Sequence, residues 1–113
     1  MTNELREPTF LVLTALADGK KHGYAIIAEA ASISDGRVQL KAGTLYAALE
    51  RLEADDLVVK AGEEVVEGRL RRYYELSDSG AALLATEAAR QQHNAAAATT
   101  RLRARSIQVA VAQ

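Results

Sequence analysis

The sequence has no cysteine and no tryptophan, and it holds one proline and one phenylalanine in 113 residues. Without cysteine, neither a disulfide framework nor a thiolate metal site can form. One phenylalanine and four tyrosines are too few for the stacking platforms on which single-strand nucleic-acid binders hold bases. No apolar run approaches the roughly 20 residues of a membrane span, and no secretory leader opens the chain. We therefore expect a cytoplasmic protein with no membrane partner.

A strong net charge and a catalytic constellation are also missing. The formal net charge is -1, so any nucleic-acid binding must rest on local charge. The two histidines, His22 and His93, have no carboxylate in ligand spacing, which argues against a metal site. No Ser-His-Asp order, glycine-rich phosphate loop or pair of catalytic carboxylates stands out. We expect a single domain that is not an enzyme and needs no cofactor.

Hydrophobic spacing predicts three helices in the first half of the chain. The first begins at Pro8, which suits an opening turn, and stops at Asp18-Gly19. A polar turn, Lys20 to Gly23, leads to a second helix from about Gly23 to Ala31. After a connector over residues 32–42, the third helix opens with Gly43. Its apolar face consists of Leu45, Ala48, Leu49 and Leu52.

The second half of the chain predicts a hairpin and one long helix. Residues 57–61 and 69–76 are strand candidates, and the acidic stretch Gly62 to Gly68 is expected to be a flexible loop. The run 77–80 is rich in residues that cap helices, and a long alanine-rich helix is expected from about Ala81 to Arg103. The order predicts a mostly α fold with a small β-hairpin, a winged helix-turn-helix. We place that domain at 8–77, a C-terminal dimerisation helix at 78–105, and a tail without assigned role at 106–113.

Four separated stretches resemble one protein family. Gly43-Thr44-Leu45-Tyr46, followed by Leu49, Leu52 and Glu53, is similar to the Gly-Thr-Leu-Tyr…Leu…Leu-Glu signature of the PadR-like transcriptional regulators. The resemblance covers roughly Thr9 to Gly80. The other matching stretches are Leu11-Val12-Leu13, His22-Gly23-Tyr24, and Arg72-Tyr73-Tyr74-Glu75-Leu76-Ser77 with Gly80.

The sequence departs from the family pattern at two places. Many members have proline where this chain has Ala47, and a glycine near Asp56. The resemblance, to the compact subfamily with a single C-terminal helix, implies a dimeric winged-helix repressor of a pseudo-palindromic operator in double-stranded DNA. It further implies a small-molecule effector, often bound near the dimer interface, whose identity the sequence does not give.

The exposed face of the third helix holds the first set of expected DNA contacts. Thr44 and the neighbouring backbone N–H groups suit a phosphate, although Thr44 also suits a plain N-cap. Tyr46 either reaches phosphate or bridges the helix to the wing. Arg51 suits a base edge or phosphate, whereas Glu50 is better explained as a solvent-exposed charge. The expected contacts on this helix are Lys41, Gly43, Thr44, Tyr46, Ala47 and Arg51.

A second set of expected DNA contacts is the run Arg69, Arg71 and Arg72 in the second strand. These arginines suit a wing that grips the DNA backbone, and they equally suit an edge strand protected against aggregation by charge. Alternation places Arg69 and Arg71 on one face and Arg72 on the other. Because Glu63, Glu64 and Glu67 precede them, we expect the acidic wing tip to stay off the DNA.

The long helix carries a seam of apolar and small residues that step by four and three, typical of a coiled coil. It predicts a homodimer, with a helix folded back on its own subunit as the alternative. The expected interface consists of Phe10, Leu13, Leu84, Ala88, Gln91, Ala95, Ala98 and Leu102. The competing functional hypothesis is a winged-helix module that binds protein rather than DNA, favoured by the near-neutral charge.

Overall fold

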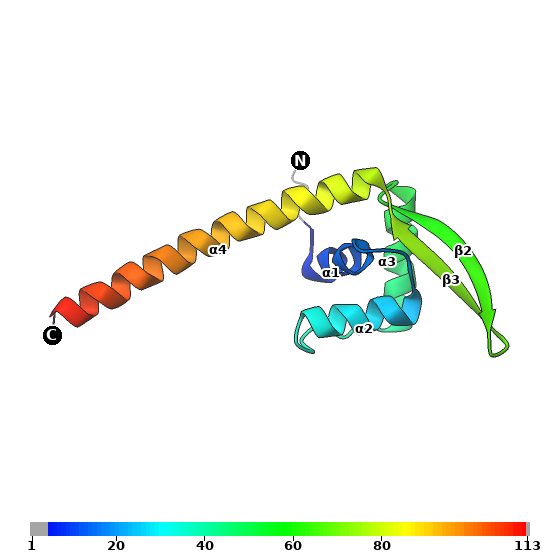
Figure 1. The fold of residues 1–113 in the computed structure, drawn as a ribbon, viewed down its shortest axis with the longest axis horizontal. Coiled ribbons are helices and arrows are strands. Elements are labelled where there is room, and N and C mark those ends of the chain that lie inside the picture. Colours follow the sequence, from blue (N-terminus) through cyan, green and yellow to red (C-terminus); the bar gives the residue numbers. More distant parts are fainter. Residues whose placement is uncertain (1–4, 113) are drawn as a thin grey trace.

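The computed structural model describes residues 5–112 and confirms a mostly α winged helix-turn-helix with a long C-terminal helix (Figure 1). Three short helices pack together, a β-hairpin projects beside them, and the last helix runs far beyond this body. The longest dimension is 67 Å. The elements are α1 (Glu7–Leu16), β1 (Lys21–His22), α2 (Gly23–Ile33), α3 (Ala42–Ala54), β2 (Val58–Val66), β3 (Arg69–Leu76) and α4 (Asp78–Ala112).

The core lies where α1, α2 and α3 meet the base of the hairpin. Pro8 stands in the first turn of α1, as expected, and five of the ten residues of this helix are buried. A helix buried on several sides needs neighbours around it, and α1 packs against both α2 and α4. The apolar face predicted for α3 is buried as predicted. The core side chains with almost no exposed surface are Val12, Leu13, Leu16, Ile26, Leu45, Leu49 and Val58.

The polar turn expected at Lys20 to Gly23 contains a short strand, β1. Lys21 lies opposite Tyr74 and His22 opposite Tyr73, so β1 extends the hairpin into a three-stranded sheet in the order β1-β3-β2. The Lys21 ammonium donates to the Ala15 carbonyl at 2.6 Å and ties the strand to α1. Two polar residues carry no hydrophobic alternation, which is why the sequence did not indicate a strand.

The hairpin is longer than predicted, because the stretch expected to be a flexible loop is mostly strand. β2 continues to Val66, and the connection is the two-residue turn Glu67-Gly68. Both turn residues have positive φ, 52° and 77°, as in the type I′ turns that match strand twist. A bulge between Lys60 and Glu63 adds one residue to β2. Bulges of this kind bend the strand and increase its twist.

The long helix begins at Asp78 and ends at Ala112, well beyond the predicted end at Arg103. The tail expected after residue 105 is therefore helical through 112, and Gln113 lies outside the described residues. Ser77 caps the helix by accepting the Gly80 N–H at 2.9 Å and donates to the Asp56 carbonyl at 2.6 Å. A side chain on Gly80 would collide with the Leu57 carbonyl, so glycine allows α4 to pack tightly on the wing base.

One charged residue of α4 is buried where the helix crosses the body. Glu87 is 3% exposed and accepts two hydrogen bonds from Arg90, at 3.0 Å and 2.8 Å. The hydrogen bond from Arg90 is the main reason that the pKa of Glu87 is lowered, and the Leu5 backbone N–H contributes in the same direction. Beyond this point, almost every side chain of α4 is exposed.

Candidate nucleic-acid interface

The face of α3 that turns away from the core carries the residues expected to contact DNA. The helix begins at Ala42, with Lys41 as its N-cap, so Thr44 lies in the first turn and the N-cap alternative for Thr44 is wrong. The first helical hydrogen bond joins the Leu45 N–H to the Lys41 carbonyl at 2.9 Å. The N–H groups before it have no helical acceptor, and such groups attract anions. The exposed residues of this face are Lys41, Gly43, Thr44, Tyr46, Ala47, Glu50 and Arg51.

Gly43 is exposed, and its place in the helix does not depend on the small size of glycine. A Cβ atom built on Gly43 would have no neighbour within 4 Å, and the residue lies within a regular helix. The protein itself therefore leaves room for a side chain at this position. The open space lies beside the unpaired N–H groups of the first turn.

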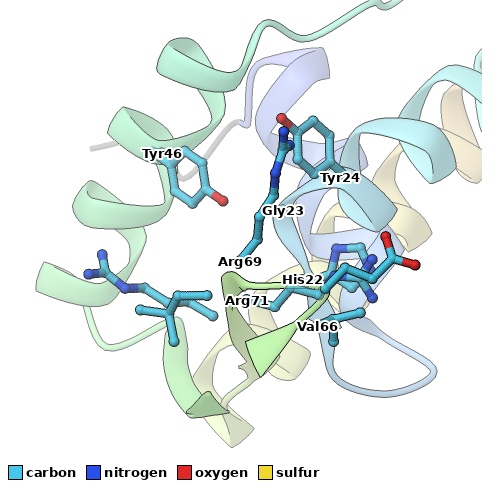
Figure 2. A pocket seen from close by; sticks show the side chains of 10 residues that line it. His22, Gly23, Tyr24, Tyr46, Val66, Arg69 and Arg71 are labelled. Carbon is cyan, nitrogen blue, oxygen red and sulfur yellow. The ribbon is translucent and has the colours of Figure 1, made fainter. Parts of the chain in front are cut away.

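Tyr46 contacts α2 rather than standing free in solvent. Its hydroxyl lies 2.5 Å from the position that a Cβ on Gly23 would occupy, so a larger residue at position 23 would displace the Tyr46 ring. The side chain is 42% exposed, and Figure 2 shows it directed from α3 toward the start of α2. Gly23 thus leaves room for the Tyr46 ring at the start of α2, on the side that faces the wing.

A groove of about 470 Å³ separates the start of α2 and α3 from the wing (Figure 2). The Arg69 side chain extends from β3 toward Tyr24, which is 68% exposed. The groove places hydroxyl and guanidinium donors around one concave surface, as an anionic backbone requires. Its lining consists of His22, Gly23, Tyr24, Tyr46, Val66, Glu67, Arg69, Leu70, Arg71 and Arg72.

The three wing arginines differ in their acidic neighbours. Arg72 lies opposite Glu63 and forms an ion pair with it at 3.8 Å. Glu64, opposite Arg71, instead accepts a hydrogen bond from the Tyr73 hydroxyl at 2.9 Å. Within residues 5–112, Arg69 and Arg71 have no ion pair, so their charge is available to a ligand.

Only some of the residues predicted to contact DNA lie together in the structure. Tyr46 shares the groove with the three wing arginines. Thr44 and Arg51 instead line a separate cavity of about 190 Å³, which they share with Arg6 at the start of α1. The acidic end of α3 turns toward β2, where Glu53 lies 3.9 Å from the Lys60 ammonium.

Two groove residues, His22 and Tyr24, were not predicted as site residues. His22 accepts the Ala25 N–H at 3.4 Å as the N-cap of α2, and its ring meets Tyr73 edge-on at 5.7 Å. Tyr24 lies at helical spacing from the half-buried Ile27, yet it is itself largely exposed. The His-Gly-Tyr stretch was visible in the sequence, but only the fold shows that it faces the wing.

Most residues predicted for the dimer interface are exposed, and the others pack against their own subunit. Leu13 has no exposed surface, because it lies in the core of its own subunit, and its assignment to the interface is wrong. Leu84 and Phe10 are half-buried. The remaining seam residues, Ala88, Gln91, Ala95, Ala98 and Leu102, are exposed along α4.

The described part of the chain contains no cluster of three or more metal-ligating side chains. Among residues 5–112, no helix combines the length and hydropathy needed to cross a bilayer.

Comparison with known proteins points to one group of regulators. The model of the transcriptional regulator PadR-like family matches residues 12–86. The transcriptional regulator Rv3488 of Mycobacterium tuberculosis is 40% identical over 73 residues, which are 65% of this chain and 64% of that protein. An uncharacterized 37.1 kDa protein of a transposon in Streptomyces fradiae is 49% identical over 78 residues, which are 69% of this chain and 21% of that protein.

Solved structures share the fold over most of the chain. A PadR family regulator from Clostridium difficile has a TM-score of 0.68 at 26% identity, covering 86% of this chain and 99% of that one. Bacillus subtilis PadR, solved in complex with operator DNA, has a TM-score of 0.63 at 21% identity. That likeness covers 72% of this chain and 46% of the Bacillus protein.

Proposed function

Because the chain belongs to the PadR-like family of transcriptional regulators, we propose that it acts as a homodimeric repressor of a pseudo-palindromic operator in double-stranded DNA. α3 enters the major groove, and the wing holds the adjacent backbone. The Bacillus protein of the same fold was solved with operator DNA, which supports this assignment.

One observation carries the proposal: Tyr46, on the exposed face of α3, lines the same groove as the unpaired wing arginines Arg69 and Arg71. A helix whose outer face is Gly43, Ala47 and neighbouring short side chains approaches base edges closely. Arg69 and Arg71 carry positive charge without an acidic partner in the part of the chain described by the structure. This local charge supports DNA binding in a chain whose net charge is -1.

The dimer rests on α4, which extends beyond the body with an exposed seam (Figure 1). Two copies of this helix bury the seam against each other, and alanines allow close approach. Phe10, half-buried on α1, stays in the proposed interface, whereas Leu13 leaves it. In a two-fold dimer the two α3 helices meet half-sites about one helical turn of DNA apart. The proposed division into a domain at 8–77 and a dimerisation helix from 78 onward follows from this arrangement.

Selection of bound duplexes from a random DNA pool tests the proposal directly. We expect a two-fold symmetric consensus whose half-sites are roughly 10 base pairs apart, centre to centre. A protein-interaction module would enrich no sequence and would show no salt-dependent affinity for duplex DNA. That result would overturn the proposed function.

The wing arginines predict a measurable salt effect. Each phosphate contact contributes about 0.9 to the slope of log affinity against log salt, so one contact in each subunit contributes about 1.8. Arg71→Ala should lower the slope by about that amount on the selected duplex. Arg72→Ala is the matched control and should change it less, because Glu63 already neutralises part of its charge. Equal slopes for Arg71→Ala and the wild type would exclude a phosphate contact by Arg71.

The small-molecule effector stays a prediction from the resemblance. The chain has no tryptophan to stack on a planar ligand. The cavity lined by Thr44 and Arg51 adjoins the proposed DNA face, so a ligand there would compete with DNA for these two side chains.

A further inference from the structure

A small cavity between the start of α1 and α3 combines an apolar bottom with two positive charges. Its volume is about 190 Å³. Val12, Leu45 and Ala48 line it with side chains that are buried in the subunit. Arg6 and Arg51 line the same cavity and are exposed to solvent. The cavity is therefore apolar at its bottom and cationic at its mouth.

The two arginines at the mouth of the cavity have no acidic partner. Glu7, which follows Arg6 in the sequence, is instead bound by Arg37, whose guanidinium donates to it at 2.6 Å. This contact with Arg37 is the main reason that the pKa of Glu7 is lowered. Within residues 5–112, neither Arg6 nor Arg51 forms an ion pair. An anion at the mouth therefore meets two guanidinium groups that can bind it.

The size and the lining of the cavity define the class of anion that fits. A water molecule takes up about 30 Å³, so the cavity has room for about six waters or an organic molecule of similar size. Drug-sized ligands need roughly 300 Å³ or more and are too large. The described lining contains no aromatic side chain on which a planar ring could stack. A short branched aliphatic chain therefore suits the bottom of the cavity, and a carboxylate suits the two arginines.

We propose that this cavity binds a short branched aliphatic monocarboxylate, whose carboxylate lies between Arg6 and Arg51 and whose chain packs in the apolar bottom. The bound ligand occupies Arg51 and Thr44, two of the residues proposed to contact DNA, so it competes with the duplex. This competition rests on the proposed DNA-binding function, whereas binding of the carboxylate does not. The site lies within one subunit, since its described lining comes from α1, α3 and the residues just before them and includes no residue of α4.

Isovalerate is the probe, and a ligand of its size, about seven non-hydrogen atoms, binds in the millimolar to micromolar range. Titration of the isotope-labelled full chain, followed by heteronuclear NMR, should give saturable shifts of the amides of Val12, Leu45 and Ala48. Isoamyl alcohol lacks the charge and acetate lacks the chain, so each should bind at least about tenfold more weakly. No saturable shift with isovalerate, or equal binding of either control compound, would overturn the inference.

Arg6→Gln removes one guanidinium without changing the residues proposed to contact DNA. Arg6 is the N-cap of α1, but its side chain makes no capping hydrogen bond, so the helix should stay intact. The loss of a charge-assisted hydrogen bond should weaken isovalerate binding about tenfold. Arg105→Gln is the matched control, since Arg105 is an exposed arginine of α4 outside the cavity, and it should bind like the wild type. Equal affinities of Arg6→Gln and the wild type for isovalerate would contradict the assignment of Arg6.

Competition with DNA is measured by fluorescence anisotropy on the selected duplex. At an isovalerate concentration about ten times its dissociation constant, competition in both subunits should lower the DNA affinity of the wild type about a hundredfold. The same concentration should lower the DNA affinity of Arg6→Gln only about fourfold. Sodium acetate at an equal concentration corrects for the effect of added salt.

The outcomes separate this inference from the proposed function. Isovalerate that binds without weakening the DNA complex would overturn the competition. A lower salt slope for Arg6→Gln in the absence of isovalerate would assign Arg6 to a DNA phosphate and overturn the inference. A wild type that binds isovalerate but no duplex would overturn the proposed function and leave the carboxylate site intact.

Discussion

Replacing Gly43 by alanine should affect stability and DNA binding in opposite directions. The change adds one methyl group in the first turn of α3, where a Cβ meets no protein atom within 4 Å. Alanine is favoured over glycine in helix interiors by about 0.8–1.0 kcal/mol, and the gain is smaller near the end. We expect a gain of about 0.5 kcal/mol in the free energy of unfolding. For a chain of this size, that raises the melting temperature by roughly 2 °C.

The same methyl group should weaken binding to the selected duplex. In a helix, Cβ atoms tilt toward the N-terminus, so the methyl of Gly43→Ala occupies the space before the first-turn N–H groups. A DNA phosphate held there loses its charge-assisted hydrogen bonds, which contribute about 1.5 kcal/mol at the low end. With two subunits the loss is about 3 kcal/mol, which is roughly a hundredfold in affinity.

Two measurements check this pair of effects: thermal unfolding at one fixed protein concentration, and fluorescence anisotropy with the labelled selected duplex. Thr86→Ala is the control, since it also improves helix propensity at an exposed position, on α4 and outside the proposed seam. It should raise the melting temperature without changing affinity. If Gly43→Ala binds as tightly as the wild type, no phosphate lies at the start of α3 and that part of the reasoning is wrong.

Three further predictions concern α4. Gly80→Ala should lower the free energy of unfolding by about 2 kcal/mol in urea titrations, because the new Cβ collides with the Leu57 carbonyl; an unchanged midpoint would contradict the tight packing. Glu87→Gln should unfold at a lower temperature at pH 7. The difference in melting temperature should disappear as pH falls below 4.5 and through the lowered pKa of Glu87, because the protonated wild type also loses its ion pair with Arg90. A difference that does not change with pH would show that this ion pair is not its cause. Leu102→Glu should shift the mass by light scattering from dimer to monomer, whereas a persistent dimer would remove α4 from the interface.

The helices of the body were predictable because their patterns are local. Leu45, Leu49 and Leu52 repeat at helical spacing, and all three are buried. The extent of β2 was not predictable in the same way. Gly62, Glu63 and Glu64 resemble a loop, and they form a strand because β3 supplies partners such as Arg72 for Glu63. The length of β2 is therefore set by its pairing with β3, and the residue pattern within β2 alone does not reveal this pairing.

The C-terminal end and the interface illustrate the same limit. Ile107, Val109 and Val111 alternate as strand residues do, but they continue a helix that contains no glycine or proline after Gly80. Extending an existing helix is easier than starting a strand without a partner. The apolar residues of α1 lie on several sides of the helix. The sequence does not show which of them pack in the core of their own subunit and which are left for a second subunit. Leu13 meets its own core.

The join between the wing and α4 has a mechanical consequence. Ser77 and Gly80 fasten the helix to the base of the hairpin without an intervening linker, and the helix continues for 35 residues, or about 52 Å. Because α4 is attached to the wing base at one end only, a small rotation there produces a large displacement at its other end. A tilt of roughly 5° at Gly80 moves the far end by about 4–5 Å, close to the rise of one helical turn. In the proposed dimer, a small change of angle at this glycine would therefore change the distance between the two α3 helices.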